Sequence, residues 1–183
     1  MNGVDALARG APVTIGAVHA ADRDALRFLL AETGQFGADE VRIAVELFDE
    51  AFALGGGDGL DPEVYAFVGA RRADGTLAGY ACWGRTPHTR GCCDLYWLAV
   101  APSEQGRGTG GRLLQAAEGA MRADGGRLSL VEASGRANAA GARRFYERHG
   151  YACAAVARDF YARGDDRLSF VRRLRPTGHA PSG

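Results

Sequence analysis

The sequence contains no lysine, since all 22 of its basic residues are arginine, and these balance 22 acidic residues to a formal net charge of zero. The absence of lysine excludes lysine Schiff-base chemistry and the lysine of nucleotide-binding P-loops. A nucleic-acid-binding surface normally needs an excess of basic groups to neutralise phosphates. The balanced charge therefore predicts no nucleic-acid partner.

Cysteine is scarce and long apolar runs are missing. The four cysteines show neither C-x-x-C spacing nor the regular framework of a small secreted protein, so we expect free thiols in a reducing compartment. The histidine and cysteine positions form no recognisable ligand set, which predicts no metal. No stretch approaches about 18 apolar residues, and no signal-peptide pattern occurs. We therefore expect a cytoplasmic protein without a membrane partner.

The remaining composition is that of a folded protein. The chain has 183 residues, of which 46% are hydrophobic and 24% charged, and this is enough to bury a core without disulfides. We predict one domain over residues 13–174, with a flexible N-terminus at 1–12 and a flexible C-terminal tail at 175–183.

Periodicity predicts alternating strands and helices. Strands are expected at 13–18, 64–71, 77–84, 93–100, 128–133, 152–161 and 168–174. Helices are expected after a cap at Asp22, at 39–52, from the glycines at 106–111 to about 123, and at 139–149. A turn is expected at 164–166. The order combines an antiparallel meander with one parallel β-α-β step, and it predicts an α+β fold.

The glycine-rich segment 106–111 satisfies the G-x-G-x-x-G pattern of dinucleotide-binding folds, with Glu132 about 20 residues farther on. Two features count against that interpretation. Five residues separate Val100 from Gly106, whereas a dinucleotide fold turns tightly from its strand into the glycines. The chain after Glu132 also offers too few elements for the remaining parallel strands.

The same segment reads Gln105-x-x-Gly108-x-Gly110, which resembles the Q/R-x-x-G-x-G/A signature of the GNAT N-acetyltransferase superfamily. It follows a strand that ends in Val-x-Pro, and it opens a helix. Residues 145–151, Phe-Tyr-Glu-Arg-His-Gly-Tyr, resemble the closing helix of that superfamily. The chain thus resembles GNAT members, and residues 94–100 and 159–166 resemble the corresponding phrases of a little-characterised GNAT subgroup. The resemblance implies a mixed, mostly antiparallel sheet of about six to seven strands with four helices, splayed at its central parallel pair.

The resemblance implies acetyl-CoA as cosubstrate. Inward-turned N–H groups at a helix N-terminus hold a diphosphate without lysine. One departure from the family pattern is that Ala139 occupies the position of a common asparagine, one step from Asn138. The residues expected to contact the coenzyme are Leu98, Val100, Gln105, Gly106, Arg107, Gly108, Thr109, Gly110 and Asn138.

Three side chains are candidates for proton transfer. Tyr146 matches the tyrosine that protonates the departing thiolate in many GNAT members. Asp94 and Glu132 are alternative general bases for the attacking amine, each by resemblance to a different group of acetyltransferases. Strand alternation places Asp94 on one face with Tyr96 and Leu98.

The predicted reaction is direct transfer of the acetyl group to a primary amine of a small molecule or peptide. The expected substrate contacts are Phe36, Trp83, Tyr96 and Tyr161, since aromatic and acidic groups together suit a cationic amine. The alternative is a catalytically silent module that binds acyl-CoA as a sensor or structural ligand. Dimers are common for this fold, so a homodimer is the assembly that analogy suggests.

Overall fold

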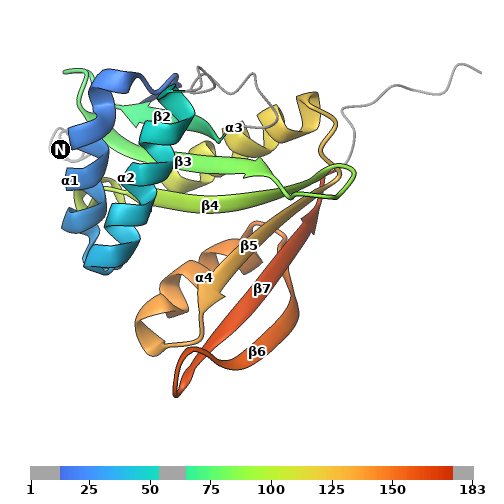
Figure 1. Ribbon diagram of the computed structural model, residues 1–183. Helices are drawn as coiled ribbons and strands as arrows, with labels where there is room; N and C mark the ends of the chain where they lie inside the picture. The colour runs from blue at the N-terminus through green and yellow to red at the C-terminus, as the bar shows by residue number, and fades with distance from the viewer. Residues whose placement is uncertain (1–12, 54–64, 175–183) are drawn as a thin grey trace, which may run out of the picture.

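Seven strands form one mixed sheet in the computed structural model, which describes residues 13–53 and 65–174 (Figure 1). The strand order is β1-β2-β3-β4-β5-β7-β6, and every neighbouring pair is antiparallel except β4 with β5. This arrangement confirms the predicted α+β class and the expected parallel pair at the centre of the sheet.

The elements follow the predicted order. The strands are β1 (Thr14–Gly16), β2 (Ala66–Arg71), β3 (Leu77–Arg85), β4 (Cys92–Val100), β5 (Leu128–Ser134), β6 (Ala152–Ala162) and β7 (Asp165–Arg173). The helices in the described residues are α1 (Arg23–Thr33), α2 (Ala38–Ala53), α3 (Thr109–Ala123) and α4 (Ala140–Arg148), with short 3₁₀ segments at Ala20–Asp22, Pro102–Glu104 and Ala137–Ala139. The predicted flexible segments 1–12 and 175–183, and the predicted strand start at 64, lie outside the described residues.

Two sequence-based expectations about local structure are corrected. Asp165 was expected in a turn, but it pairs with Ala162 as the first residue of β7, and its side chain is buried. Asp22 precedes α1 without capping it through its side chain. The Asp22 carboxylate instead accepts the His19 N–H and binds the Arg71 guanidinium, which ties α1 to β2.

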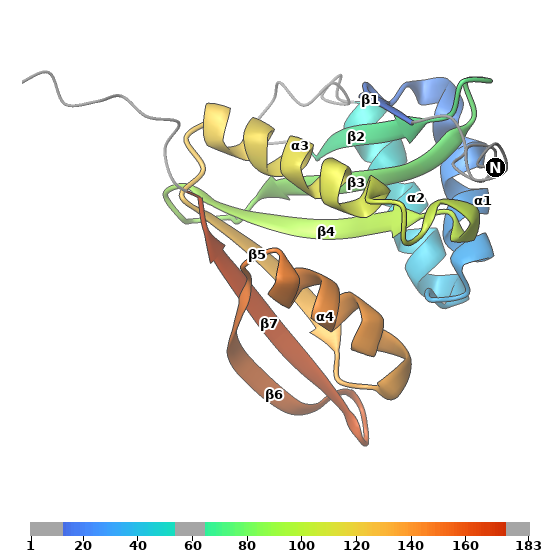
Figure 2. The ribbon, with the colours of Figure 1, turned by 180° about the vertical axis from the view of Figure 1, so that it is seen from behind.

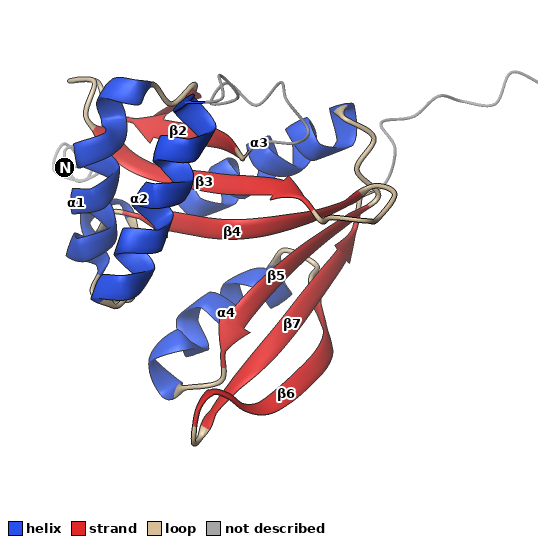
Figure 3. Cartoon of the chain, in the orientation of Figure 1, coloured by secondary structure: helices blue, strands red, loops and turns tan. Residues whose placement is uncertain are grey.

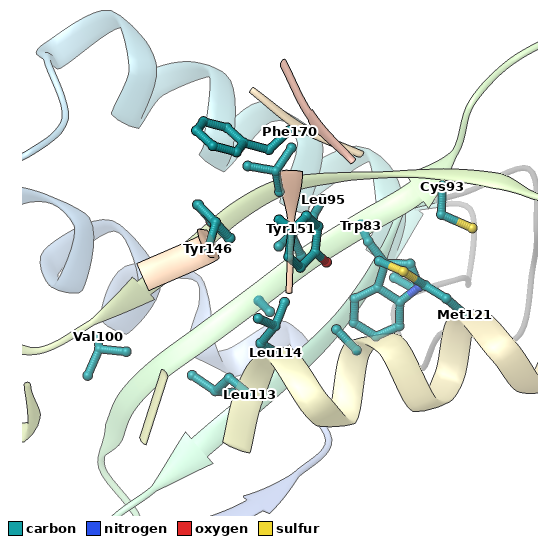
Figure 4. Packing of buried hydrophobic residues seen from close by; sticks show 14 of the residues in the cluster. Trp83, Cys93, Leu95, Val100, Leu113, Leu114, Met121, Tyr146, Tyr151 and Phe170 are labelled. Carbon is teal, nitrogen blue, oxygen red and sulfur yellow. The ribbon is translucent and has the colours of Figure 1, made fainter. Parts of the chain in front are cut away.

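The helices cover the sheet on two sides: α1 and α2 on one, α3 and α4 on the other (Figures 1 and 2). Each side has its own apolar core, because the helices present residues at three- and four-residue spacing to the sheet. The core on the α1 side includes Leu26, Leu30, Phe48, Phe67 and Tyr80. The core on the α3 side includes Leu113, Leu114, Met121, Tyr146 and Phe170, as Figure 4 shows.

Strands β4 and β5 pair over only three positions before they separate. The pairs are Cys92 with Leu128, Cys93 with Ser129, and Asp94 with Leu130. Beyond them the two strands diverge, as Figure 3 shows, so that residues 95–100 of β4 have no partner strand on this edge. The splay predicted for the central parallel pair is therefore present.

A buried carboxylate connects the two halves of the sheet near the closed end of this splay. Glu118 of α3 is 1% exposed, and its oxygens lie 2.8 and 2.9 Å from the guanidinium of Arg172 in β7. The Arg122 guanidinium lies 3.0 Å away, and the Tyr151 hydroxyl lies 3.1 Å from Glu118 and 2.8 Å from Ser129 of β5. Because a buried charge is costly unless it is paired, this network constrains how α3 sits against β5 and β7.

Two buried tyrosines allow a test of these cores. The Tyr80 hydroxyl has no hydrogen-bond partner among the described residues, and burial raises the pKa of Tyr80 well above its usual value. We expect Tyr80→Phe to leave the free energy of unfolding unchanged or to raise it by about 1 kcal/mol, since an unsatisfied buried group is removed. Tyr151→Phe should lower it by about 1–3 kcal/mol because Glu118 and Ser129 lose a partner. Denaturant unfolding measures both, and equal destabilisation by the two variants would contradict the assignment.

Candidate functional site

The start of α3 presents main-chain N–H groups for which the described residues supply no acceptor. Gly106 and Gly108 have φ values of 73° and 84°, which glycine adopts without strain. The first main-chain bond at this end of α3 runs from the Arg112 N–H to the Gly108 carbonyl, at 3.1 Å. Within the described residues, the N–H groups of 106–111 donate no hydrogen bond. Such a cluster, together with the positive end of the helix dipole, favours an anion.

The helix start lies between the end of β4 and α4. A Cβ on Gly110 would approach the Phe145 ring of α4 to 3.3 Å and the Val100 side chain of β4 to 3.6 Å. The Gln105 side chain donates to the Val100 carbonyl at 3.0 Å and so fixes the loop to the strand end. The free N–H groups therefore lie at the open end of the splay, where the Arg107 side chain is exposed.

The residues predicted to contact the coenzyme arm lie on the diverging part of β4 or directly after β5. Leu98 and Val100 are on the part of β4 that lacks a β5 partner, and both pack against the core on the α3 side. Asn138 is exposed on the 3₁₀ turn that follows β5. Thr109, by contrast, is buried at the first position of α3, so that its main chain rather than its side chain is available to a ligand.

A β-bulge at Tyr96 corrects one sequence-based expectation. The partners of Leu95 and Trp97 are adjacent in β3, which leaves Tyr96 without a partner. An extra residue shifts the side chains beyond it to the opposite face. Leu98 thus packs with the core on the α3 side, whereas Tyr96 lies on the α1 side. The prediction that Asp94, Tyr96 and Leu98 share one face is wrong for Leu98.

Tyr146 of α4 is 8% exposed and is surrounded by aromatic rings. Its ring centroid lies 5.2 Å from that of Phe145, 5.5 Å from that of Tyr151 and 6.5 Å from that of Phe170. This burial raises the pKa of Tyr146 above its ordinary value of 10.0. The phenol therefore stays protonated at neutral pH, as a proton donor must be.

The two candidate bases differ in position. Asp94 lies in the paired part of β4, where its carboxylate accepts a hydrogen bond from the Thr86 hydroxyl at 2.7 Å. Glu132 lies two residues beyond Leu130, the last β5 residue paired with β4, so it borders the diverging part. Its exposed carboxylate is 3.3 Å from the Arg167 guanidinium of β7.

Of the predicted substrate residues, two are aromatic side chains exposed to solvent. Tyr96 is 38% exposed and packs edge-on against Tyr65, with ring centroids 5.3 Å apart. Partial burial raises the pKa of Tyr96 to about 12, and the nearby Asp94 charge contributes a smaller part of this rise. Tyr161 near the end of β6 is 48% exposed. Phe36, in the α1–α2 link, is half-buried against the core on the α1 side.

Trp83 has a different environment from these residues. Its side chain is 8% exposed and belongs to the core on the α3 side, near Cys93 and Met121 (Figure 4). Tyr96, on the α1 side, lies on the other face of the sheet from Trp83. This position in the core distinguishes Trp83 from the exposed Tyr96 and Tyr161, and its contact with substrate stays a prediction.

Sequence reasoning missed the contacts that fix the link between β5 and α4. The buried carboxylate of Asp165 lies 2.5 Å from the Ser134 hydroxyl and 3.0 Å from the Arg136 guanidinium. Arg143 of α4 donates to the main-chain carbonyls of Ser134 and Arg136 at 2.6 and 2.7 Å. These residues hold the turn that carries Asn138. The sequence offered no signal for them because the aspartate looked like an ordinary turn residue.

Two features of the described residues concern metals and membranes. No three histidine, cysteine, aspartate or glutamate side chains in the described ranges gather as metal ligands would. None of the helices in these ranges has both the length and the apolar character needed to span a bilayer. The absence of a resident metal stays a prediction.

Comparison with known families decides between the two interpretations of the glycine segment. The model of the acetyltransferase (GNAT) family matches residues 23–151. The chain belongs to the GNAT acetyltransferase family. The predicted enzyme class, an acyltransferase, is thereby confirmed, and the dinucleotide-binding interpretation is excluded. Comparison with curated protein sequences gives no match.

Solved structures agree with this assignment. A protein from Desulfovibrio desulfuricans assigned to the GNAT family is 40% identical, with a TM-score of 0.80 over 89% of this chain and 99% of the other. The ribosomal-protein-S18-alanine N-acetyltransferase from Escherichia coli is 19% identical, with a TM-score of 0.70 over 93% and 99%. An aminoglycoside 6'-N-acetyltransferase complexed with coenzyme A is 16% identical, with a TM-score of 0.70 over 90% and 99%. The last two share the fold.

The contacts of Asp165 predict a measurable effect on this site. We expect Asp165→Ala to lower the free energy of unfolding by about 1–3 kcal/mol, because the Ser134 hydroxyl and the Arg136 guanidinium lose a charged partner. The turn carrying Asn138 should loosen as well, which raises the KM for acetyl-CoA. Asp24→Ala is the control, since that side chain is 81% exposed. Denaturant unfolding and steady-state kinetics measure both effects, and equal behaviour of the two variants would contradict this role.

Proposed function

We propose that this protein transfers the acetyl group of acetyl-CoA directly to a primary amine of a small molecule or peptide. One observation carries the proposal: the unused N–H groups of 106–111 adjoin the end of β4, whose edge lacks a strand partner beyond Asp94. A diphosphate suits the first feature, and the amide-containing pantetheine arm suits the second. The position of these two features also supports the predicted coenzyme contacts of Leu98, Val100, Gln105, Arg107 and Asn138.

Glu132 is the base that the geometry favours. A protonated amine must lose a proton before it attacks the thioester carbon, and a carboxylate accepts that proton directly or through water. Glu132 borders the diverging part of β5, and its side chain is exposed, whereas Asp94 lies in the paired part and is held by Thr86. Asp94 instead contributes charge near Tyr96.

Tyr146 supplies the proton that completes the reaction. The amine nitrogen bonds to the thioester carbon, the C–S bond breaks, and the thiolate takes the phenolic proton. The nitrogen then passes its surplus proton to the tyrosinate, which restores Tyr146. A main-chain N–H of β4, with Leu98 as the candidate, stabilises the oxyanion. The alternative function, a silent acyl-CoA-binding module, requires no proton donor at all.

The variant Tyr146→Phe distinguishes the enzyme from the silent module. We expect wild-type protein to bind acetyl-CoA in calorimetry and to release thiol with at least one amine of a panel of amino acids, peptides, polyamines and aminoglycosides. Tyr146→Phe should retain the affinity and lower kcat by about 10²–10⁴-fold. Because burial raises the pKa of Tyr146, turnover should not fall between pH 7 and about 9. Glu147→Gln, on the exposed face of α4, is the control. Affinity without thiol release from any amine would favour the module, and no affinity would contradict both.

Paired amide variants separate the candidate bases. Glu132→Gln should lower kcat/KM by about 10²–10⁴-fold, since the amide cannot accept the proton of the acceptor ammonium. Asp94→Asn should change activity far less. Steady-state kinetics of both variants provides the measurement. A larger loss in Asp94→Asn would reverse the assignment.

A further inference from the structure

The guanidinium of Arg167 is unusual among the arginines near the splay. Arg143 and Arg172 each donate two hydrogen bonds to protein acceptors. Arg167 donates none within the described residues, and its Nε is buried without a partner there. Its ion pair with Glu132 is 3.3 Å long and lacks hydrogen-bond geometry, and its side chain is 32% exposed. The guanidinium therefore keeps donors that the described residues do not use.

An aromatic ring fixes the plane of this guanidinium. The Phe160 ring centroid lies 4.0 Å from the Arg167 Cζ atom, within the range of a cation–π contact. Residues 158–161 of β6 leave the ladder with β7, because the register moves from Ala157 directly to Ala162. This bulge is what carries Phe160 across to Arg167.

The bulge is held by hydrogen bonds of its own. Asp159 has a left-handed φ of 53°, which is strained for a residue with a Cβ. Its N–H donates to the Asp166 carboxylate at 2.9 Å, and its own carboxylate accepts the Gly164 N–H at 2.5 Å. Asp159 and Asp166 therefore maintain the position of Phe160, and a strained bulge kept at this point indicates a use for the side chains that it presents.

Arg167 lies on the same face of the sheet as the proposed base. Glu132 pairs with Ser169 and Arg167 pairs with Ser134, so the two charged side chains are diagonal neighbours on one face. Burial raises the pKa of Tyr161, and the nearby charges of Glu132 and of Glu40 in α2 add to this rise. This face therefore borders both the diverging strands and the α1–α2 side of the molecule.

We propose that Arg167 determines acceptor specificity by binding a carboxylate that the acceptor carries next to its amine, as in an amino acid. The inference rests on the proposed acetyltransferase function and specifies its substrate class. A guanidinium with free donors and a fixed plane matches a carboxylate in two-point geometry. A purely cationic amine gains nothing from Arg167 and is repelled by it.

The ion pair between Arg167 and Glu132 gives this recognition a second consequence. While paired, the Glu132 carboxylate faces the Arg167 guanidinium and not an acceptor ammonium. An acceptor carboxylate that binds Arg167 replaces Glu132 as its partner. Glu132 then takes one proton from the acceptor ammonium, and the neutral nitrogen attacks the thioester carbon. The sulfur leaves with the proton of Tyr146, and the nitrogen passes its second proton to the tyrosinate. Carboxylate binding thus coincides with release of Glu132 from Arg167.

The test compares amino acids with their own carboxamides, which keep the amine and lose the negative charge. Wild-type protein with acetyl-CoA should show a kcat/KM about 10–100-fold higher for the carboxylate member of each accepted pair. Arg167→Gln should abolish this ratio while retaining activity on carboxamides, and Arg167→Lys should restore part of it. Arg173→Gln, an exposed site farther along β7, is the control and should keep the wild-type ratio.

Three outcomes would overturn the proposal: carboxamides or polyamines preferred by wild-type protein, an unchanged ratio in Arg167→Gln, or an equal loss on both members of each pair. Calorimetry of N-acetyl amino acids and N-acetyl amino acid amides, added to protein saturated with coenzyme A, decides the question independently of turnover. Preference for the carboxylates that disappears in Arg167→Gln supports the Arg167 site even if no amine is acetylated. Absence of any coenzyme A binding would instead reject the proposed function.

Discussion

The contact of Glu118 with Arg172 is the interaction on which the arrangement of the site depends. It joins α3, which begins at the free N–H groups, to β7, which carries Arg167 and pairs with β5. A buried carboxylate that two guanidinium groups pair with has few other low-energy positions, because moving it would leave charges unpaired. The two halves of the sheet can therefore separate beyond Asp94 and Leu130 while remaining fixed at their closed end.

The absence of lysine determines how this chain would hold a polyanion. Main-chain N–H groups at the start of α3 provide donors that need no charged side chain, and the glycines let the loop adopt the left-handed turns that expose them. The close approach of Gly110 to α4 shows that the same small residues also permit packing. One short segment thus serves both the anion site and the contact between the two helices.

On the acceptor side, charge and aromatic rings are combined in a different way. A bulge in β4 leaves Tyr96, on the α1 side, without a partner in β3, and a bulge in β6 accompanies the contact of Phe160 with Arg167. Both bulges interrupt a regular ladder and so change which side chains the strand presents on each face. Arg167 and Glu132 neutralise each other across β5 and β7. The region is thus suited to an acceptor that carries both charges, more than to one that is only cationic.

The sequence by itself determined the class of fold, the order of the elements, the glycine segment and the family. These depend on local periodicity and on a contiguous motif, and both are properties of neighbouring residues. Tertiary structure alone decided the face of Leu98, the burial of Trp83 and Asp165, and the pairing of Glu132 with Arg167. A bulge displaces every later side chain by one position, and an ion pair between strands depends on register. Neither is visible in a single strand, because both arise only when two strands pair.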